Sequence, residues 1–138
     1  MQMTSLWTRL QAIIAVFLIV TACAVEAVAT EPTLVEVWCG GDDGLTIRLR
    51  DALENAFKSS PRFRLSFGKK PKTLIVSIPT NVEWNKVGKK TQVLYTVEFS
   101  SADNQKIGTS TGSCWDNAFA KCAAQIVKDA ETAARKVL

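Results

Sequence analysis

The segment QVLYTVEFS, residues 92–100, alternates apolar and polar side chains at every position but Leu94. A period of two places Val93, Tyr95, Val97 and Phe99 on one side of a strand and polar residues on the other. A strand with one polar face belongs to a sheet that is covered on one side and open to water on the other. The chain is therefore limited to folds in which a sheet carries a single covering layer.

Other segments supply the remaining sheet and its cover. Strand patterns occupy residues 34–39, 62–67, 73–78 and 92–100, with a short polar last strand at 106–112. Pro79 interrupts the third strand and favours an edge, a bulge or the end of the strand, after which residues 80–84 resume the pattern weakly. The order strand, helix, four strands, helix predicts an α+β, two-layer sandwich with a mainly antiparallel sheet and two helices on one face.

Two segments have helical periodicity. Leu45, Leu49, Leu53 and Phe57 recur at intervals of four between residues 45 and 60, and the GGDDG turn before them supplies aspartates suited to capping this helix. Apolar residues recur at intervals of three and four from residue 115 to 137, which predicts a final helix with Ser113 as its N-cap.

The N-terminal segment has the pattern of an export signal. Arg9 is followed by about 16 residues without charge, fewer than the roughly 20 that a membrane-spanning helix needs. Small residues at Ala27 and Ala29 predict cleavage after residue 29, which leaves residues 30–138 as a single small domain in the periplasm or secreted. The alternative is a lipoprotein signal over residues 1–22. In that case VTAC, residues 20–23, is the lipidation motif, Cys23 is lipidated, and the mature protein is an outer-membrane lipoprotein.

Cysteine usage agrees with an oxidising compartment. Cys39, Cys114 and Cys122 remain after either cleavage, which predicts one disulfide with either a buried free thiol or an intermolecular bridge at the third cysteine. On one predicted helix, Cys114 and Cys122 would be separated by a rise of about 12 Å, too far for a bond between them. We therefore expect a disulfide between Cys39 and Cys114 and a buried free thiol at Cys122.

The sequence offers little that could carry catalysis. It contains no histidine, so histidine-based acid–base chemistry and histidine metal ligation are excluded. The GGDDG turn matches no phosphate-binding motif, and the chain has no metal-ligand spacing. We expect a protein that is not an enzyme, with no catalytic residue, no metal and no cofactor.

Lysine and arginine residues gather in two parts of the sequence and suggest a basic interaction surface. If the two loops emerge on one side, they form a basic rim that could meet an envelope protein or an anionic envelope component, although lysine-rich turns also keep hairpins soluble. Nucleic acid is not expected in this compartment, and a membrane would be reached only through the possible lipid anchor. The residues of this surface are Arg62, Arg64, Lys69, Lys70, Lys72, Lys86, Lys89 and Lys90.

The segment LRDALENAFKSSPRFRLSF, residues 49–67, resembles the amino-terminal domain of the translocation protein TolB and related envelope domains of the CsgG and LpoB type. The resemblance covers residues 34–67 and implies a small α/β domain that serves in envelope protein–protein contact. We therefore expect a non-enzymatic, exported, disulfide-bearing accessory protein that binds another envelope component. The alternative is a periplasmic inhibitor or immunity-type protein for a secreted enzyme. A third hypothesis, binding of a small ligand, requires a cavity between the sheet and the helices lined by Trp38, Trp84 or Trp115.

Overall fold

The structure, a computed structural model, describes residues 31–136, all within the unit Glu31–Leu138. The predicted export signal, its cleavage site and the alternative lipidation site Cys23 lie outside the described residues.

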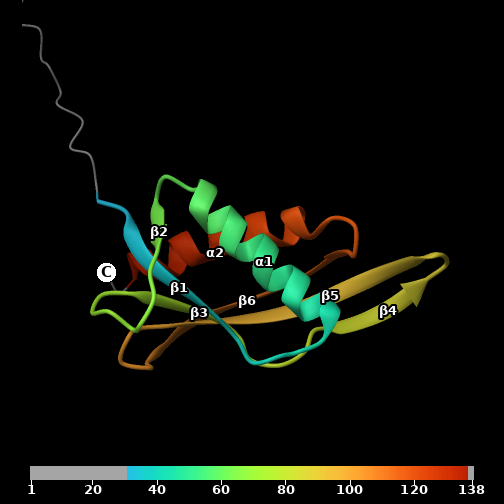
Figure 1. Cartoon of the computed structure of the whole chain (residues 1–138), viewed down its shortest axis with the longest axis horizontal. Coiled ribbons are helices and arrows are strands. Elements are labelled where there is room, and N and C mark those ends of the chain that lie inside the picture. Colours follow the sequence, from blue (N-terminus) through green and yellow to red (C-terminus); the bar gives the residue numbers. More distant parts are fainter. Residues whose placement is uncertain (1–30, 137–138) are drawn as a thin grey trace, which may run out of the picture. The chain divides into compact units, whose positions relative to one another are not determined.

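The described residues form six strands and two helices, one strand more than predicted between the helices, because Glu83–Val87 form a strand of their own. The α+β, two-layer architecture is confirmed, with both helices on one face of a mixed, mostly antiparallel sheet (Figure 1). The elements are β1 (Thr33–Cys39), α1 (Gly44–Ser59), β2 (Phe63–Leu65), β3 (Leu74–Ile78), β4 (Glu83–Val87), β5 (Lys90–Ser100), β6 (Lys106–Trp115) and α2 (Phe119–Arg135).

β5 is the strand through which most of the sheet is connected. Its C-terminal half pairs with β3 and its N-terminal half with β4, both antiparallel and along the same edge. Its other edge pairs antiparallel with β6 along almost its whole length. β1 joins the sheet beyond β3 and runs parallel to both β2 and β3.

The chain leaves the sheet between β3 and β4. The last β3 pair joins Ser77 to Glu98, and the first β4 pair joins Glu83 to Leu94. The predicted interruption at Pro79 is therefore confirmed, since residues 79–82 pass outside the sheet before the strand resumes.

Residues 79–82 are held against the start of α1 by hydrogen bonds. The N–H of Val82 donates to Thr46 Oγ1 at 2.9 Å, and Thr46 is fully buried. Asn81 Oδ1 accepts from the backbone N–H groups of Asp42 (2.8 Å) and Asp43 (3.1 Å). A side chain at Gly41 would overlap Asn81 Oδ1, so this close approach requires glycine.

The predicted capping role of the GGDDG turn is confirmed. Asp43 is the N-cap of α1, and its carboxylate accepts the backbone N–H of Thr46 at 2.7 Å. Hydrogen bonds from Thr46 hold the pKa of Asp43 below its ordinary value. The carboxylate also faces the positive end of the helix dipole, which is a favourable place for negative charge.

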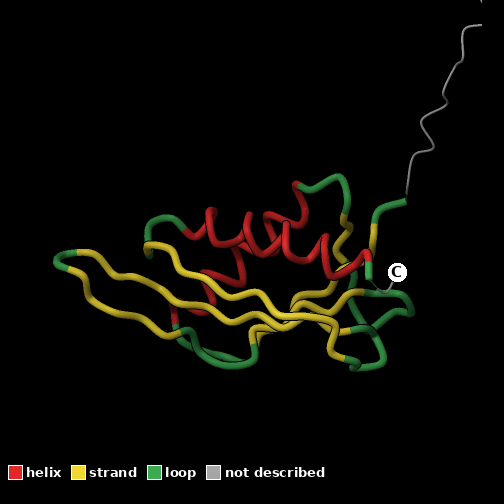
Figure 2. The backbone as a smooth tube through the Cα atoms, turned by 180° about the vertical axis from the view of Figure 1, so that it is seen from behind, coloured by secondary structure: helices red, strands yellow, loops and turns green. Residues whose placement is uncertain are grey.

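The hydrophobic core lies between the helices and the sheet face beneath them. Figure 2 shows from the opposite side that both helices lie above the same face of the strands. The other sheet face, which we call the outer face, carries the polar side chains of β5 and β6. Core residues from the helices include Leu49, Leu53, Phe57, Phe119 and Ile126, and those from the sheet include Val35, Val76, Val93, Val97 and Phe99.

The predicted start of the final helix is wrong. Ser113 is not an N-cap, because the strand continues through Trp115, where it pairs with Gln92 of β5. α2 begins at Phe119, after a turn, and its N-cap Ala118 makes no side-chain capping hydrogen bond. Pairing along the full length of β5 therefore outweighs the local capping preference of a serine.

A polar network that is buried at Tyr95 and Ser110 and exposed at Gln125 joins β5, β6 and α2. Tyr95 is almost fully buried and lies directly opposite Gly112 of β6. Ser110 Oγ donates to Asp129 Oδ2 at 2.5 Å, and Gln125 Nε2 donates to the second oxygen of Asp129 at 2.9 Å. The pKa of Tyr95 is raised above its ordinary value, mainly because the side chain is buried. The hydrogen bond with Ser110 opposes this shift, and the negative charge of Asp129 adds to it.

Gly112 has no room for a side chain, whereas Gly108 on the same strand does. A Cβ at position 112 would lie 2.6 Å from the Tyr95 hydroxyl and 2.9 Å from its Cζ. A Cβ at position 108 would make only ordinary van der Waals contacts, the nearest with the Phe99 ring at 3.8 Å. We expect Gly112→Ala to lower the free energy of unfolding by about 1–3 kcal/mol through overpacking. Gly108→Ala is the matched control, with an expected change near zero or a gain of up to about 1 kcal/mol. Equal effects in urea unfolding would contradict this packing.

Tyr95 is the only tyrosine in the sequence, so its ionisation can be followed directly by ultraviolet absorbance. We expect a midpoint above the ordinary value of about 10, because burial favours the neutral phenol. The free energy of unfolding then falls as pH rises through the unfolded pKa toward the folded one. Asp129→Asn removes a nearby negative charge and should lower the midpoint; an ordinary or unchanged midpoint would contradict the network.

Candidate interaction surface

The structure places the predicted basic residues in two separate groups. Lys69 Nζ donates to Asn104 Oδ1 at 3.0 Å, so the β2–β3 loop lies beside the turn after β5. Lys86, Lys89 and Lys90 lie at the opposite end of β5, in the β4–β5 hairpin. Ten residues of strand separate the two ends, a distance of about 33 Å. The eight cations therefore do not form one basic rim.

In the first group, Lys69 has a structural role. Its backbone N–H donates to Glu36 Oε2 at 2.9 Å, and its ammonium lies 4.9 Å from the centre of the Trp38 ring. Glu36 is largely buried on the outer face of β1, so this contact holds the β2–β3 loop against that face. Sequence reasoning missed Glu36, although a carboxylate inside a short apolar strand is a signal that it needs a hydrogen-bond donor.

The second group lies on a hairpin that projects beyond the helices (Figure 1). Every residue of β4 is exposed, including two large apolar side chains, Trp84 at 52% and Val87 at 50%. Lys86 Nζ donates to Thr91 Oγ1 at 2.9 Å, and Lys90 Nζ lies 5.3 Å from the centre of the Trp115 ring. We call Trp84, Lys86, Val87, Lys89 and Lys90 the hairpin surface.

This arrangement combines two kinds of contact that protein partners use. Exposed tryptophan and valine offer apolar area, and tryptophan is enriched among the residues that dominate binding energy. The lysines add positive charge that attracts acidic partners from a distance and weakens with salt. Glu83, at the base of the hairpin, is the one acidic residue in β4.

The predicted single disulfide is present, but its predicted pairing is wrong. Cys114 bonds to Cys122, with their Cα atoms 5.8 Å apart, so Cys122 is not a free thiol. The prediction failed because Cys114 belongs to β6 rather than to the final helix. The turn before α2 then brings Cys122 back over Cys114, which removes the separation expected along one helix.

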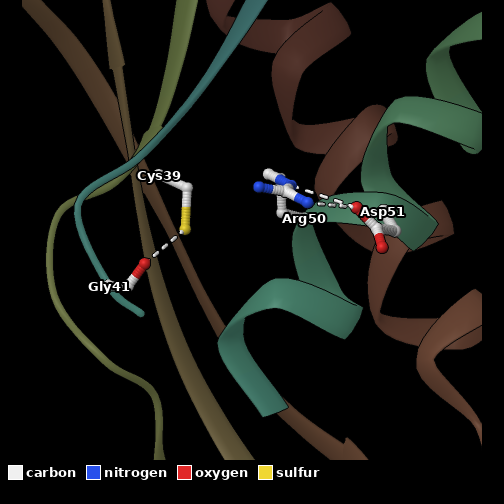
Figure 3. A network of polar contacts seen from close by, with 4 residues as sticks. All are labelled: Cys39, Gly41, Arg50 and Asp51. Atoms are coloured by element: carbon white, nitrogen blue, oxygen red, sulfur yellow. Dashed lines mark hydrogen bonds and ion pairs between the residues drawn. The ribbon is translucent and has the colours of Figure 1, made fainter. Parts of the chain in front are cut away.

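Cys39 is the free cysteine of the described residues 31–136. Figure 3 shows its thiol directed at the carbonyl of Gly41, to which it donates at 3.3 Å. Arg50 lies nearby on α1 and donates from Nε and Nη2 to Asp51 at 3.0 and 2.8 Å. Asp51 raises the pKa of Arg50, so the guanidinium is engaged by this carboxylate rather than by the thiol.

Two observations on residues 31–136 concern the binding of metal ions and small ligands. Within residues 31–136, no group of three or more His, Cys, Asp or Glu side chains could hold a metal ion. A groove of about 410 Å³ lies on the outer face between residues 80–83 and the strands β5 and β6. Its lining contains Thr96, Thr111 and Ser113 but no tryptophan, and it does not lie between the sheet and the helices.

No helix within residues 31–136 is long and apolar enough to cross a membrane.

Comparison with solved structures shows which kind of fold this is. The chain is similar to protein XCC0632 from Xanthomonas campestris, of the family DUF330, with a TM-score of 0.55 and 9% identity over 78% of this chain and 90% of that one. At this identity the likeness shows a shared fold alone. No family model and no curated protein sequence matches the chain.

Two further similar structures have lower scores. A dodecamer of a PelC variant from Paraburkholderia phytofirmans has a TM-score of 0.49 and 14% identity, over 76% of this chain and 88% of that one. A minor lipoprotein from Acinetobacter baumannii has a TM-score of 0.45 and 14% identity, over 73% of this chain and 94% of that one. The specific resemblance to TolB, CsgG and LpoB stays a prediction.

Thiol counting distinguishes the two disulfide pairings. Alkylation of the unfolded, unreduced mature protein should label Cys39 and leave the peptides of Cys114 and Cys122 joined. Cys114→Ser should expose two thiols and lower the free energy of unfolding by about 2–3 kcal/mol, because an eight-residue loop is no longer closed. Cys39→Ser is the control and should leave the disulfide intact. A disulfide that contains Cys39 would contradict this pairing.

Proposed function

We propose that this chain is a non-enzymatic, exported envelope protein that binds an acidic envelope protein through the hairpin surface. The observation that carries the proposal is the projecting β4–β5 hairpin, where Trp84 and Val87 are half exposed beside three lysines. The uncharged run of about 16 residues after Arg9 and the small-residue cleavage pattern support export. The disulfide between Cys114 and Cys122 agrees with an oxidising compartment.

A protein partner fits this surface better than a purely anionic polymer. Lysines alone would serve a polyanion, whereas Trp84 and Val87 add apolar area that gains free energy only when a partner covers it. Single exposed apolar residues are common on protein surfaces. Here two of them lie on one five-residue strand in a hairpin outside the main core, Trp84 with Lys86 on one face of the hairpin and Val87 with Lys90 on the other.

Matched variants test the hairpin surface. Lys86→Glu, Lys89→Glu and Lys90→Glu combined should abolish partner binding by replacing attraction with repulsion. Arg64→Glu, Lys70→Glu and Lys72→Glu combined make the same change in net charge at the other end of β5 and should leave binding nearly intact. The readout is photo-crosslinking in intact cells from a reactive residue at position 85 on β4, which neither triple variant changes, with position 58 on α1 as the control site.

Apolar truncation provides a second readout of the same surface. Trp84→Ala should weaken binding by about 2 kcal/mol or more, or about 30-fold. Phe67→Ala, at an aromatic residue in the β2–β3 loop that is more exposed than Trp84, is the control and should have little effect. Equal losses from both triple variants, or crosslinks at position 58 alone, would contradict the proposal. A single stoichiometric partner that is a secreted enzyme would instead support the inhibitor alternative.

A further inference from the structure

β6 presents a long free edge. It pairs with β5 on one side, and no other strand within residues 31–136 pairs with its second side. Ten residues make it the second longest strand of the sheet. Backbone N–H and C=O groups along such an edge are available to another strand.

The hydrogen-bond pattern shows which groups are available. Asp116 N–H donates to Thr91 O at 3.0 Å, and these two residues extend the β5–β6 register by one position beyond its end pair, Gln92 and Trp115. In an antiparallel ladder, hydrogen-bonded pairs alternate with pairs whose backbone groups point outward. The residues whose N–H and C=O groups point away from β5 are therefore Thr109, Thr111, Ser113 and Trp115.

β6 lacks the protection that the other free edges carry. β2 is three residues long and includes Arg64, and β4 contains Lys86. Both features discourage a second strand from pairing there. In β6, residues 107–115 contain neither a charged residue nor proline. Two copies of a chain with a formal charge of +4 can therefore meet at this edge without placing like charges opposite each other.

Space is open beside this edge. A groove of about 360 Å³ lies where β6 meets α2, and its lining includes Thr109 and Thr111 from the strand and Thr132 and Lys136 from the helix end. An added strand would therefore lie along β6 next to α2.

We propose that two copies of this chain pair antiparallel through their β6 edges and form one continuous sheet. The alternation allows a register centred on Gly112, which brings all four outward-facing residues into hydrogen-bonded pairs. Thr109 then lies opposite Trp115 of the second copy, and Thr111 opposite Ser113. These are a β-branched–aromatic pair and a pair of hydroxyl residues, both favourable across strands. This inference is independent of the hairpin surface and of its partner.

Paired charge substitutions test the edge. Thr111→Lys with Ser113→Lys places lysines directly opposite lysines in this register and should convert the dimer to single chains. Gln92→Lys with Thr96→Lys adds the same charge to the outer face of β5, one strand inward, and should leave the dimer intact. The measurement is sedimentation velocity of the mature exported protein between about 1 and 100 μM, a range that brackets micromolar association, with circular dichroism to verify folding of each variant.

Hydrogen exchange tests the same dimer in the wild-type protein, so the result does not depend on whether a variant folds. The amides of residues 110, 112 and 114 bond to β5 in a single chain and should be protected at any concentration. Those of Thr109, Thr111, Ser113 and Trp115 should gain at least about tenfold protection as the dimer forms. A single-chain wild type at the highest concentration, no alternating gain in protection, or equal dissociation of both lysine variants would overturn the proposal.

Discussion

The pairing of β5 on both of its edges is the constraint on which this structure depends. One strand joins β3, β4 and β6, and its alternate side chains form the centre of the core under the two helices. Because the opposite side chains are polar, the sheet can be covered on one face alone. The helices, the disulfide and the projecting hairpin all take their positions from this strand.

Local patterns were enough to predict the layers of the fold but not the end of β6. Alternation predicted β5, apolar spacing predicted α1, and Pro79 marked the break before β4. Ser113 failed as a helix start because its neighbours bond to β5, a contact with residues about twenty positions earlier that no local preference encodes. The error in cysteine pairing followed from this one, since a strand residue and a helix residue eight positions apart can meet where two helix residues cannot.

The candidate surface was harder to predict for a related reason. The basic residues were visible in the sequence, but which loops share an end of the sheet depends on the direction of β5 and on its partners. The basic residues lie in two separate groups at opposite ends of β5. Lys69 contacts Glu36 and Trp38 and helps to hold the β2–β3 loop against the sheet. Trp84 and Val87 became candidates only when their exposure on the hairpin was known, because strand patterns alone do not show which apolar residues lack a cover.

The excursion at residues 79–82 has a mechanical consequence. The hairpin is separated from β3 by this gap in the sheet, but Asn81 and Val82 bond to the turn and first residues of α1. Tension applied at the hairpin tip therefore has two routes into the body: through the β5 ladder, and through three short hydrogen bonds to the helix start. Force on the hairpin tip therefore acts on both the sheet and the helix layer, and not on the hydrogen bonds of one strand alone.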